Sequence, residues 1–88
     1  MKKIGEQYQY RWKIKLEDQR TYKKWGSDYV EAFRDISSTM IGLGYTNRSV
    51  YKIGKNHFII KLIRKHKYGV KIKIAYLLRL EIKRKLEI

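Results

Sequence analysis

Two long segments of this 88-residue chain alternate apolar and polar side chains with a period of two, which is the pattern of half-buried β-strands. In the segment 7–17 the even-numbered residues are apolar and the odd-numbered residues are polar. In the segment 70–83 the even-numbered residues are again apolar, and most of the odd-numbered ones are charged. Strands of this kind need a sheet with one face against a core, so the chain is predicted to fold around a sheet.

A helix is predicted between these two strands, over residues 28–42. Asp28, or the serine before it, is a suitable N-cap, and Glu31 follows at the spacing of a capping box. Glycines at 42 and 44 can supply a left-handed C-cap. Apolar residues recur at helical spacing and form one stripe, which consists of Tyr29, Phe33, Ile36, Met40 and Leu43.

Two shorter strands are predicted after the helix, over 48–53 and 57–64, with a glycine-containing turn at 54–56 between them. A second turn at 66–69 leads directly into the last long strand, so these three strands form a meander. The segment 79–88 fits either a strand or a helix, because its apolar residues satisfy both periods.

The expected fold is therefore a single small α+β domain over 1–88, in the order β-α-β-β-β. One helix packs on a four-stranded sheet in two layers, and the C-terminal segment is a strand or a second helix. The even-numbered residues of the first and last strands are expected to face the helix. The strand order in the sheet is left open.

The charge of the chain is strongly positive and unevenly distributed. Lys and Arg number 22 against 8 Asp and Glu, for a formal net charge of +14. Residues 45–88 have thirteen Lys and Arg against two acids, whereas residues 1–44 have nine against six. Such an imbalance favours a polyanionic partner, with DNA or RNA first and an acidic protein surface as the alternative. The alternative explanation of the positive charge is a codon bias toward Lys and Ile, which needs no partner.

The odd-numbered side chains of the predicted strands place many cations on the sheet face opposite the helix. A solvated face that keeps the domain soluble is the competing interpretation. The residues predicted to bind nucleic acid or an acidic partner are Arg11, Lys13, Lys15, Lys52, Lys61, Lys71, Lys73 and Arg79.

Aromatic and apolar side chains add two further predictions. Tyr22, Trp25 and Tyr68 lie in predicted loops and are candidates for stacking on bases. Ile59, Ile63 and Leu77 are expected to form an apolar island within the basic face. That island would contact a partner or a second copy in a homodimer, or be covered by the C-terminal segment.

Several function classes are not supported by the sequence. Cysteine is absent, which excludes thiolate nucleophiles, disulfides and cysteine metal sites. His57 and His66 fall at opposite ends of one predicted strand, too far apart to share a metal. No glycine-rich phosphate loop, membrane-spanning run or signal peptide is visible. We therefore expect no catalysis, cofactor or metal, no membrane partner, and a cytoplasmic protein.

The leading interpretation is a small, non-catalytic nucleic-acid-binding protein that uses its Lys/Arg-rich sheet face. The predicted helix is no major-groove reader, because Asp28, Glu31 and Asp35 outweigh Arg34 on its polar side. The alternative is a phage or mobile-element protein that docks on a nucleic-acid-processing enzyme and inhibits or modulates it. In that case the basic face would meet an acidic surface and the apolar island would be the anchor.

Overall fold

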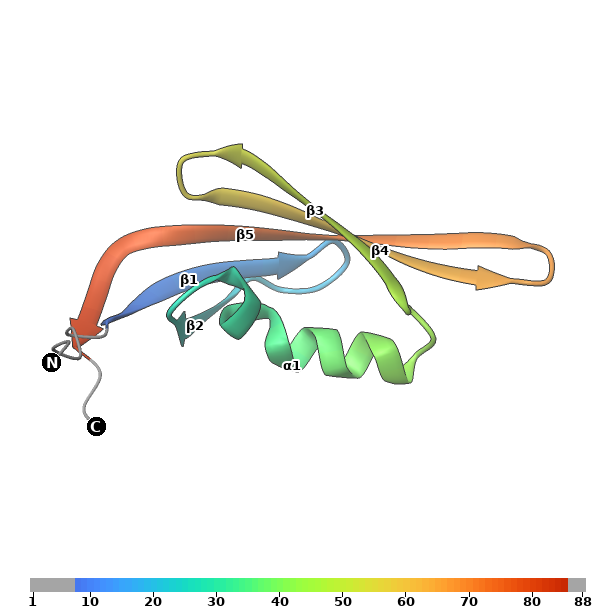
Figure 1. Cartoon of the computed structure of the whole chain (residues 1–88), viewed down its shortest axis with the longest axis horizontal. Helices are drawn as coiled ribbons and strands as arrows, with labels where there is room; N and C mark the ends of the chain where they lie inside the picture. The colour runs from blue at the N-terminus through green and yellow to red at the C-terminus, as the bar shows by residue number, and fades with distance from the viewer. Residues whose placement is uncertain (1–7, 86–88) are drawn as a thin grey trace, which may run out of the picture.

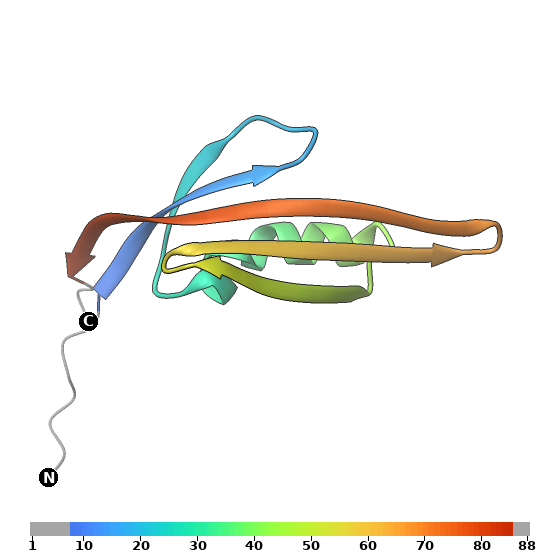
Figure 2. The ribbon, with the colours of Figure 1, turned by 90° about the horizontal axis from the view of Figure 1, so that it is seen from above.

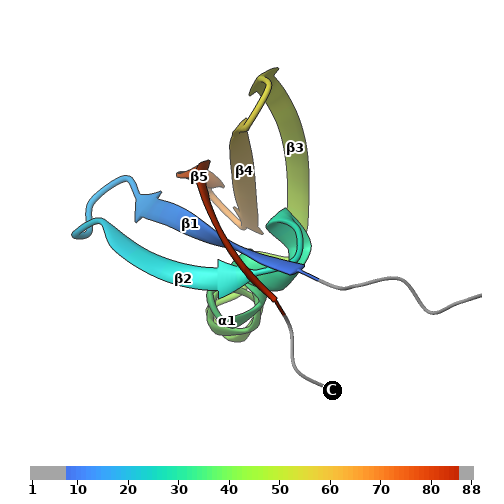
Figure 3. The ribbon, with the colours of Figure 1, turned by 90° about the vertical axis from the view of Figure 1, so that its left-hand side faces the viewer.

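The structure, a computed structural model, describes residues 8–85. Its elements are β1 (Tyr8–Leu16), β2 (Tyr22–Gly26), α1 (Tyr29–Gly42), β3 (Asn47–Gly54), β4 (His57–His66) and β5 (Gly69–Lys85). The strands form one antiparallel sheet in the order β2-β1-β5-β4-β3, and α1 lies on one side of it (Figure 1). Viewed along the long axis, the edge strands β2 and β3 diverge on either side of β5 (Figure 3).

The expected four-stranded sheet in the order β-α-β-β-β is wrong, because the sheet has five strands in the order β-β-α-β-β-β. The additional strand is β2, in a segment that was interpreted as a loop. It lacks the alternation of a strand, and its pairing with β1 is what makes it one. The segment 79–85 continues β5 as a strand, not a helix. Residues 7 and 86–88, which belong to predicted elements, lie outside the described residues.

The predicted helix is confirmed, together with both of its caps. The Asp28 carboxylate accepts a hydrogen bond from the Glu31 backbone N–H at 2.8 Å, as an N-cap does. At the other end Gly44 has φ of 94°. The Tyr45 N–H donates to the Met40 carbonyl and the Gly44 N–H to the Ile41 carbonyl, which is a Schellman ending.

The hydrophobic core lies between α1 and the three central strands, β1, β5 and β4. Phe33 and Met40 of the predicted stripe are buried, and Tyr29 and Ile36 pack against the core, whereas Leu43 is exposed. Burial of these side chains is the main stabilising contribution to the fold. The core consists of Trp12, Ile14, Leu16, Ala32, Phe33, Met40, Tyr45, Ile60, Leu62, Ala75 and Leu77.

The start of α1 approaches β2 very closely at Gly26. A Cβ built on Gly26 would lie 2.9 Å from the Ala32 backbone nitrogen, so a side chain has no room there. The Trp12 indole Nε1–H donates to the Gly26 carbonyl at 2.9 Å. Because residue 26 has no side chain, α1 can pack directly against the backbone of β2 where Trp12 is hydrogen-bonded to it.

The side of β5 that faces the helix is the opposite of the one expected. Ala75 and Leu77 are buried under α1, and the even-numbered residues of β5 point to the other face. The reason is the β4–β5 hairpin, which pairs Leu62 with Lys73 and Ile60 with Ala75. Paired residues share a face, so an even-numbered residue of β4 brings an odd-numbered residue of β5 to the helix side.

The β4–β5 hairpin extends well beyond the C-terminal end of α1 (Figure 1). The molecule is accordingly elongated, with extents of 55 × 28 × 20 Å. We call residues 64–71, the exposed end of this hairpin, the arm. Within the described residues, no helix has the length and apolar character that crossing a membrane requires.

Candidate functional site

The face of the sheet away from α1 is called the open face. Figure 2 looks toward it over β3, β4 and β5, and no other described element crosses in front of β3 or β4. On β1 the open face presents Lys13 and Lys15, both exposed, and Arg11, which is half-buried. On β2 it presents Lys23, which lies opposite Lys13 in the register. The predicted cation row of the first strand is therefore on the open face.

A cluster of three side chains lies at one end of this row. The Arg84 guanidinium carbon is 4.4 Å from the centroid of the Trp25 ring, and that of Arg11 is 5.1 Å from it. Arg84 also donates two hydrogen bonds to Gln9 Oε1, at 3.1 and 2.8 Å. Trp25 thus holds two guanidinium groups by cation–π contact. It was predicted as a loop residue that stacks on bases, and it lies instead on β2 against the protein's own arginines.

Apolar side chains occupy the open face over β4 and β5. Ile59 lies opposite Tyr76 and Ile63 opposite Ile72, so the two predicted isoleucines are on the open face as expected. Ile72 is 46% exposed and Tyr76 is 39% exposed. Lys61 is the cation within this surface, and it lies opposite Ile74. Exposed apolar side chains therefore lie next to cations on this part of the open face.

Leu77 does not belong to this surface, because it is fully buried beneath α1. Its neighbours Tyr76 and Leu78 are on the open face instead. The register of the β4–β5 hairpin could have assigned Tyr76 and Leu78 to the open face from the sequence. The turn at 66–69 was expected from the sequence, and pairing outward from it puts the even-numbered residues of the last strand on the open face.

Four of the predicted binding residues lie on the helix side of the sheet. Lys71 and Lys73 lie opposite Arg64 and Leu62. Lys73 forms an ion pair with Asp18 at 3.4 Å. The two others, Lys52 and Arg79, lie opposite Phe58 and Trp12, whose side chains are on the helix side. The prediction of one continuous basic face is wrong in this respect, because the cations divide between two sides.

The arm is the second basic region. Within residues 64–71 there are four Lys and Arg and no Asp or Glu. Arg64, Lys65, Lys67 and Lys71 are all exposed. Tyr68 is at the turn and is 87% exposed, which keeps it a candidate for contact with a ligand.

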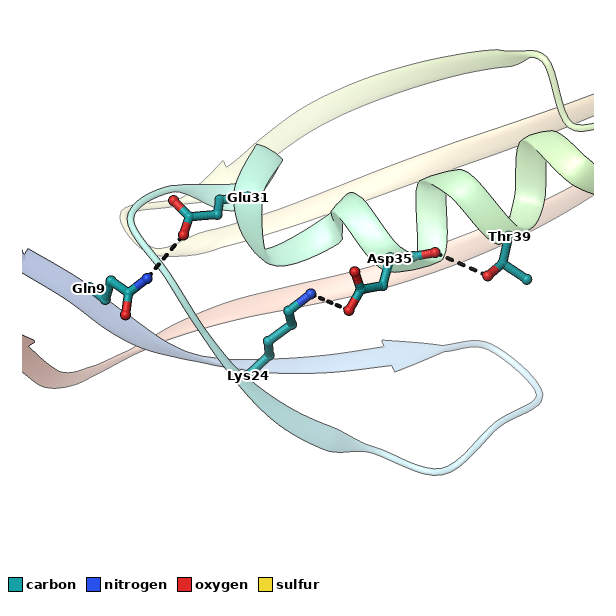
Figure 4. A network of polar contacts seen from close by, with 5 residues as sticks. All are labelled: Gln9, Lys24, Glu31, Asp35 and Thr39. Carbon is teal, nitrogen blue, oxygen red and sulfur yellow. Dashed lines mark hydrogen bonds and ion pairs between the residues drawn. The ribbon is translucent and has the colours of Figure 1, made fainter. Parts of the chain in front are cut away.

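The carboxylates of Asp28, Glu31 and Asp35 lie on α1 or at its N-cap, and Gln9 links Glu31 to the Arg84 side chain of the cluster. Lys24 forms an ion pair with Asp35, and Gln9 Nε2 donates to Glu31 at 3.0 Å (Figure 4). Hydrogen bonding to Ser27, with a smaller contribution from Gln9, lowers the pKa of the Glu31 carboxyl below its ordinary value. Two cations of the helix side, Lys24 and Lys73, therefore have carboxylate partners.

Tyr22, the third stacking candidate, is on β2 opposite Ile14 and hence on the helix side. Burial, together with the nearby charge of Asp35, raises the pKa of its hydroxyl above the ordinary value. It stays neutral at physiological pH and is 38% exposed. Tyr22 therefore lies on the opposite face of the sheet from the cation row.

The two histidines do not come together in the fold. His57 and His66 lie at opposite ends of β4, as the sequence indicated. Among residues 8–85, no three His, Cys, Asp or Glu side chains come together in a way that could hold a metal ion. The open face presents cations, hydroxyls, apolar surface and the imidazole of His57.

No family model, curated protein or solved structure matches this chain.

Proposed function

We propose that this protein binds nucleic acid without acting on it chemically, in the cytoplasm, through the open face and the arm. One observation supports this more than any other. The described ion pairs, Lys24 with Asp35 and Lys73 with Asp18, lie on the helix side. Lys13, Lys15 and the cations of the arm have no described carboxylate within ion-pair distance.

Unpaired like charges at this density have a cost. Lys13 and Lys23 lie directly opposite each other, and like charges so placed mildly destabilise a sheet. A polyanion would remove that repulsion and release its own counterions on binding. Binding of this kind depends on phosphates, so little preference among sequences is expected.

The test is a salt titration of the affinity for labelled duplex DNA, single-stranded DNA and single-stranded RNA. If about four to six phosphates are neutralised, log K falls against log salt concentration with a slope of roughly −3 to −5. Lys13→Glu/Lys15→Glu is expected to weaken binding about tenfold or more near physiological salt, because each lost phosphate contact is worth on the order of 1 kcal/mol.

The matched control is Arg34→Glu/Lys55→Glu, which changes the net charge equally. Arg34 is on the exposed side of α1 and Lys55 is in the β3–β4 turn. Equal losses in the two double variants would mean that bulk charge alone binds the polyanion and that the open face has no special part. No binding to any of the three nucleic acids at low salt would refute the proposed function.

A second candidate function is docking on a nucleic-acid-processing enzyme, with the apolar part of the open face as the anchor. The observation in its favour is the exposed aliphatic surface around Ile63 and Ile72. Ile63→Glu would then abolish inhibition of such an enzyme while leaving the monomer folded. Sedimentation of the wild type and of this variant also tests whether the same surface forms a homodimer.

A further inference from the structure

A hollow of about 260 Å³ opens on the open face, where β1, β5 and β4 lie side by side. Lys13 lies opposite Leu78 and Lys15 opposite Tyr76 across the β1–β5 pair. The hollow is lined by Lys13, Lys15, Thr21, His57, Tyr76 and Leu78.

The lining combines two kinds of surface within one small space. On the β1 side are Lys13 and Lys15, with Thr21 before β2, and their side chains are hydrogen-bond donors, while His57 lines the β4 side. On the β5 side stand the aromatic ring of Tyr76 and the aliphatic Leu78. No carboxylate lines the hollow. A ligand that fits needs negative charge at one end and a flat or apolar group at the other.

The size of the hollow limits what can enter it. Pockets for drug-sized ligands are about 300 to 1,000 Å³, so this hollow takes only one small unit of a larger ligand. Because it lies at the border between the cation row and the apolar surface, a chain-like ligand can continue from it in both directions. The Arg11–Trp25–Arg84 cluster lies two residues further along β1 and supplies more cations.

Three possible ligands of the hollow differ in charge and in whether they expose base faces: a second copy of this chain, a nucleic-acid duplex and a single strand. A second copy of this chain, at a net charge of +14, would bring cations against cations. A duplex presents phosphates but keeps its base faces stacked inside, so it cannot use Tyr76. A single strand exposes both phosphates and base faces, and strands of this kind bind to a positive groove beside aromatic platforms.

Building on the proposed function, we propose that the preferred ligand is single-stranded nucleic acid and that this hollow holds one nucleotide of it. The base stacks on the ring of Tyr76 beside Leu78, and the adjoining phosphate pairs with Lys13 and Lys15. The strand then runs along the border between the cation row and the apolar surface. Stacking of this kind tolerates any base, so the preference is for single-strandedness and not for sequence.

The experiment compares affinities for oligothymidylate, oligouridylate and a DNA duplex of equal length. Tyr76→Leu removes the ring but keeps an apolar side chain, and Tyr76→Phe keeps the ring. Tyr51→Leu is the matched control, since Tyr51 lies opposite Ile59 on the same face but does not line the hollow. Circular dichroism and thermal unfolding establish that each variant is folded.

Tyr76→Leu is expected to weaken single-strand binding about tenfold and to leave duplex binding unchanged, because a base–aromatic stack contributes to the single-strand complex alone. Tyr76→Phe and Tyr51→Leu are expected to bind like the wild type. Equal effects of Tyr76→Leu on single strand and duplex, or none on either, would overturn this inference and leave the proposed function standing. If the wild type binds neither single strand nor duplex, both this inference and the proposed function are refuted. A protein partner would then be the remaining occupant of the open face.

Discussion

The two faces of the sheet are built from alternate residues of the same strands, yet they have opposite properties. On the helix side of β5, Ala75 and Leu77 are fully buried. On the open face the residues between and beside them, Tyr76 and Leu78, are equally apolar but still accessible. The apolar character of a strand residue therefore does not tell which face stabilises the fold and which is available for binding.

The difference follows from what covers each face. The helix closes one side of β1, β5 and β4, and its Asp35 carboxylate pairs with Lys24 there. The described residues supply no cover for the open face, which retains unpaired lysines beside exposed aliphatic groups. Stability is thus expected to depend on the helix side, and ligand binding on the open face.

The largest difference between the two faces is expected when the same charge is placed at two adjacent positions of β5. Leu77→Glu buries a carboxylate in the core and is expected to cost about 3 to 5 kcal/mol, which approaches the whole stability of a domain of this size. Leu78→Glu puts the carboxylate on the open face and is expected to cost about 1 kcal/mol or less. Urea unfolding followed by circular dichroism measures both. Similar losses in the two variants would contradict the assignment of faces.

A second test uses two glycines at the helix side. Gly26→Ala forces a Cβ against the Ala32 backbone and is expected to destabilise the fold by about 1 to 3 kcal/mol. Gly42→Ala meets nothing within 4 Å, and it is expected to stabilise the helix by up to about 1 kcal/mol. Thermal unfolding of both variants gives the signs. A neutral Gly26→Ala would show that α1 can move away from β2 at little cost.

A third, smaller effect is expected at the base of the arm. Lys73→Ala removes the partner of Asp18, and a partly exposed ion pair of this kind is worth about 0 to 1 kcal/mol. Lys71→Ala removes no ion pair and should leave the free energy of unfolding unchanged. The difference should shrink as salt is added, because screening weakens the pair. A larger cost for Lys71→Ala would place that residue in an unrecognised structural contact.

The smallest expected effect is the contribution of Glu31 to the pH dependence of stability. Its pKa in the folded protein is below the ordinary value of 4.5, so ionised Glu31 stabilises the fold above that pH. The contribution is lost as the pH falls below 4.5 towards the lowered pKa. Glu31→Gln should therefore reduce stability at neutral pH and flatten the fall of the thermal midpoint in acid. Parallel curves for the two proteins would mean that Glu31 contributes nothing through ionisation.

Much of the local structure could be predicted because it depends on neighbouring residues. Asp28 and Gly44 mark the ends of α1 through capping chemistry that acts within a few residues. The turns at Lys55–Asn56 and Lys67–Tyr68 were placed for the same reason. In the candidate site, the cations of β1 and the isoleucines of β4 were also placed on the correct face.

The errors have a common physical cause. In β5 both faces are apolar from Ile74 to Leu78, so alternation alone does not identify the buried side. The side is chosen by the register with β4, in which Ile60 lies opposite Ala75. Because the prediction put the wrong side of β5 against the helix, it placed Lys71, Lys73 and Leu77 on the open face. It also left out Tyr76, the residue on which the single-strand proposal depends.

Sequence reasoning predicts the helix, its caps, the hairpin turns and the large excess of cations, because these follow from composition and from contacts between near neighbours. The folded structure is needed to show that segment 22–26 is an edge strand and that segment 79–85 extends β5. It is also needed to show how the cations divide between the two faces. Those features depend on pairing between strands distant in the chain. A shift of one residue in such a pairing exchanges the buried and the exposed side of a whole strand.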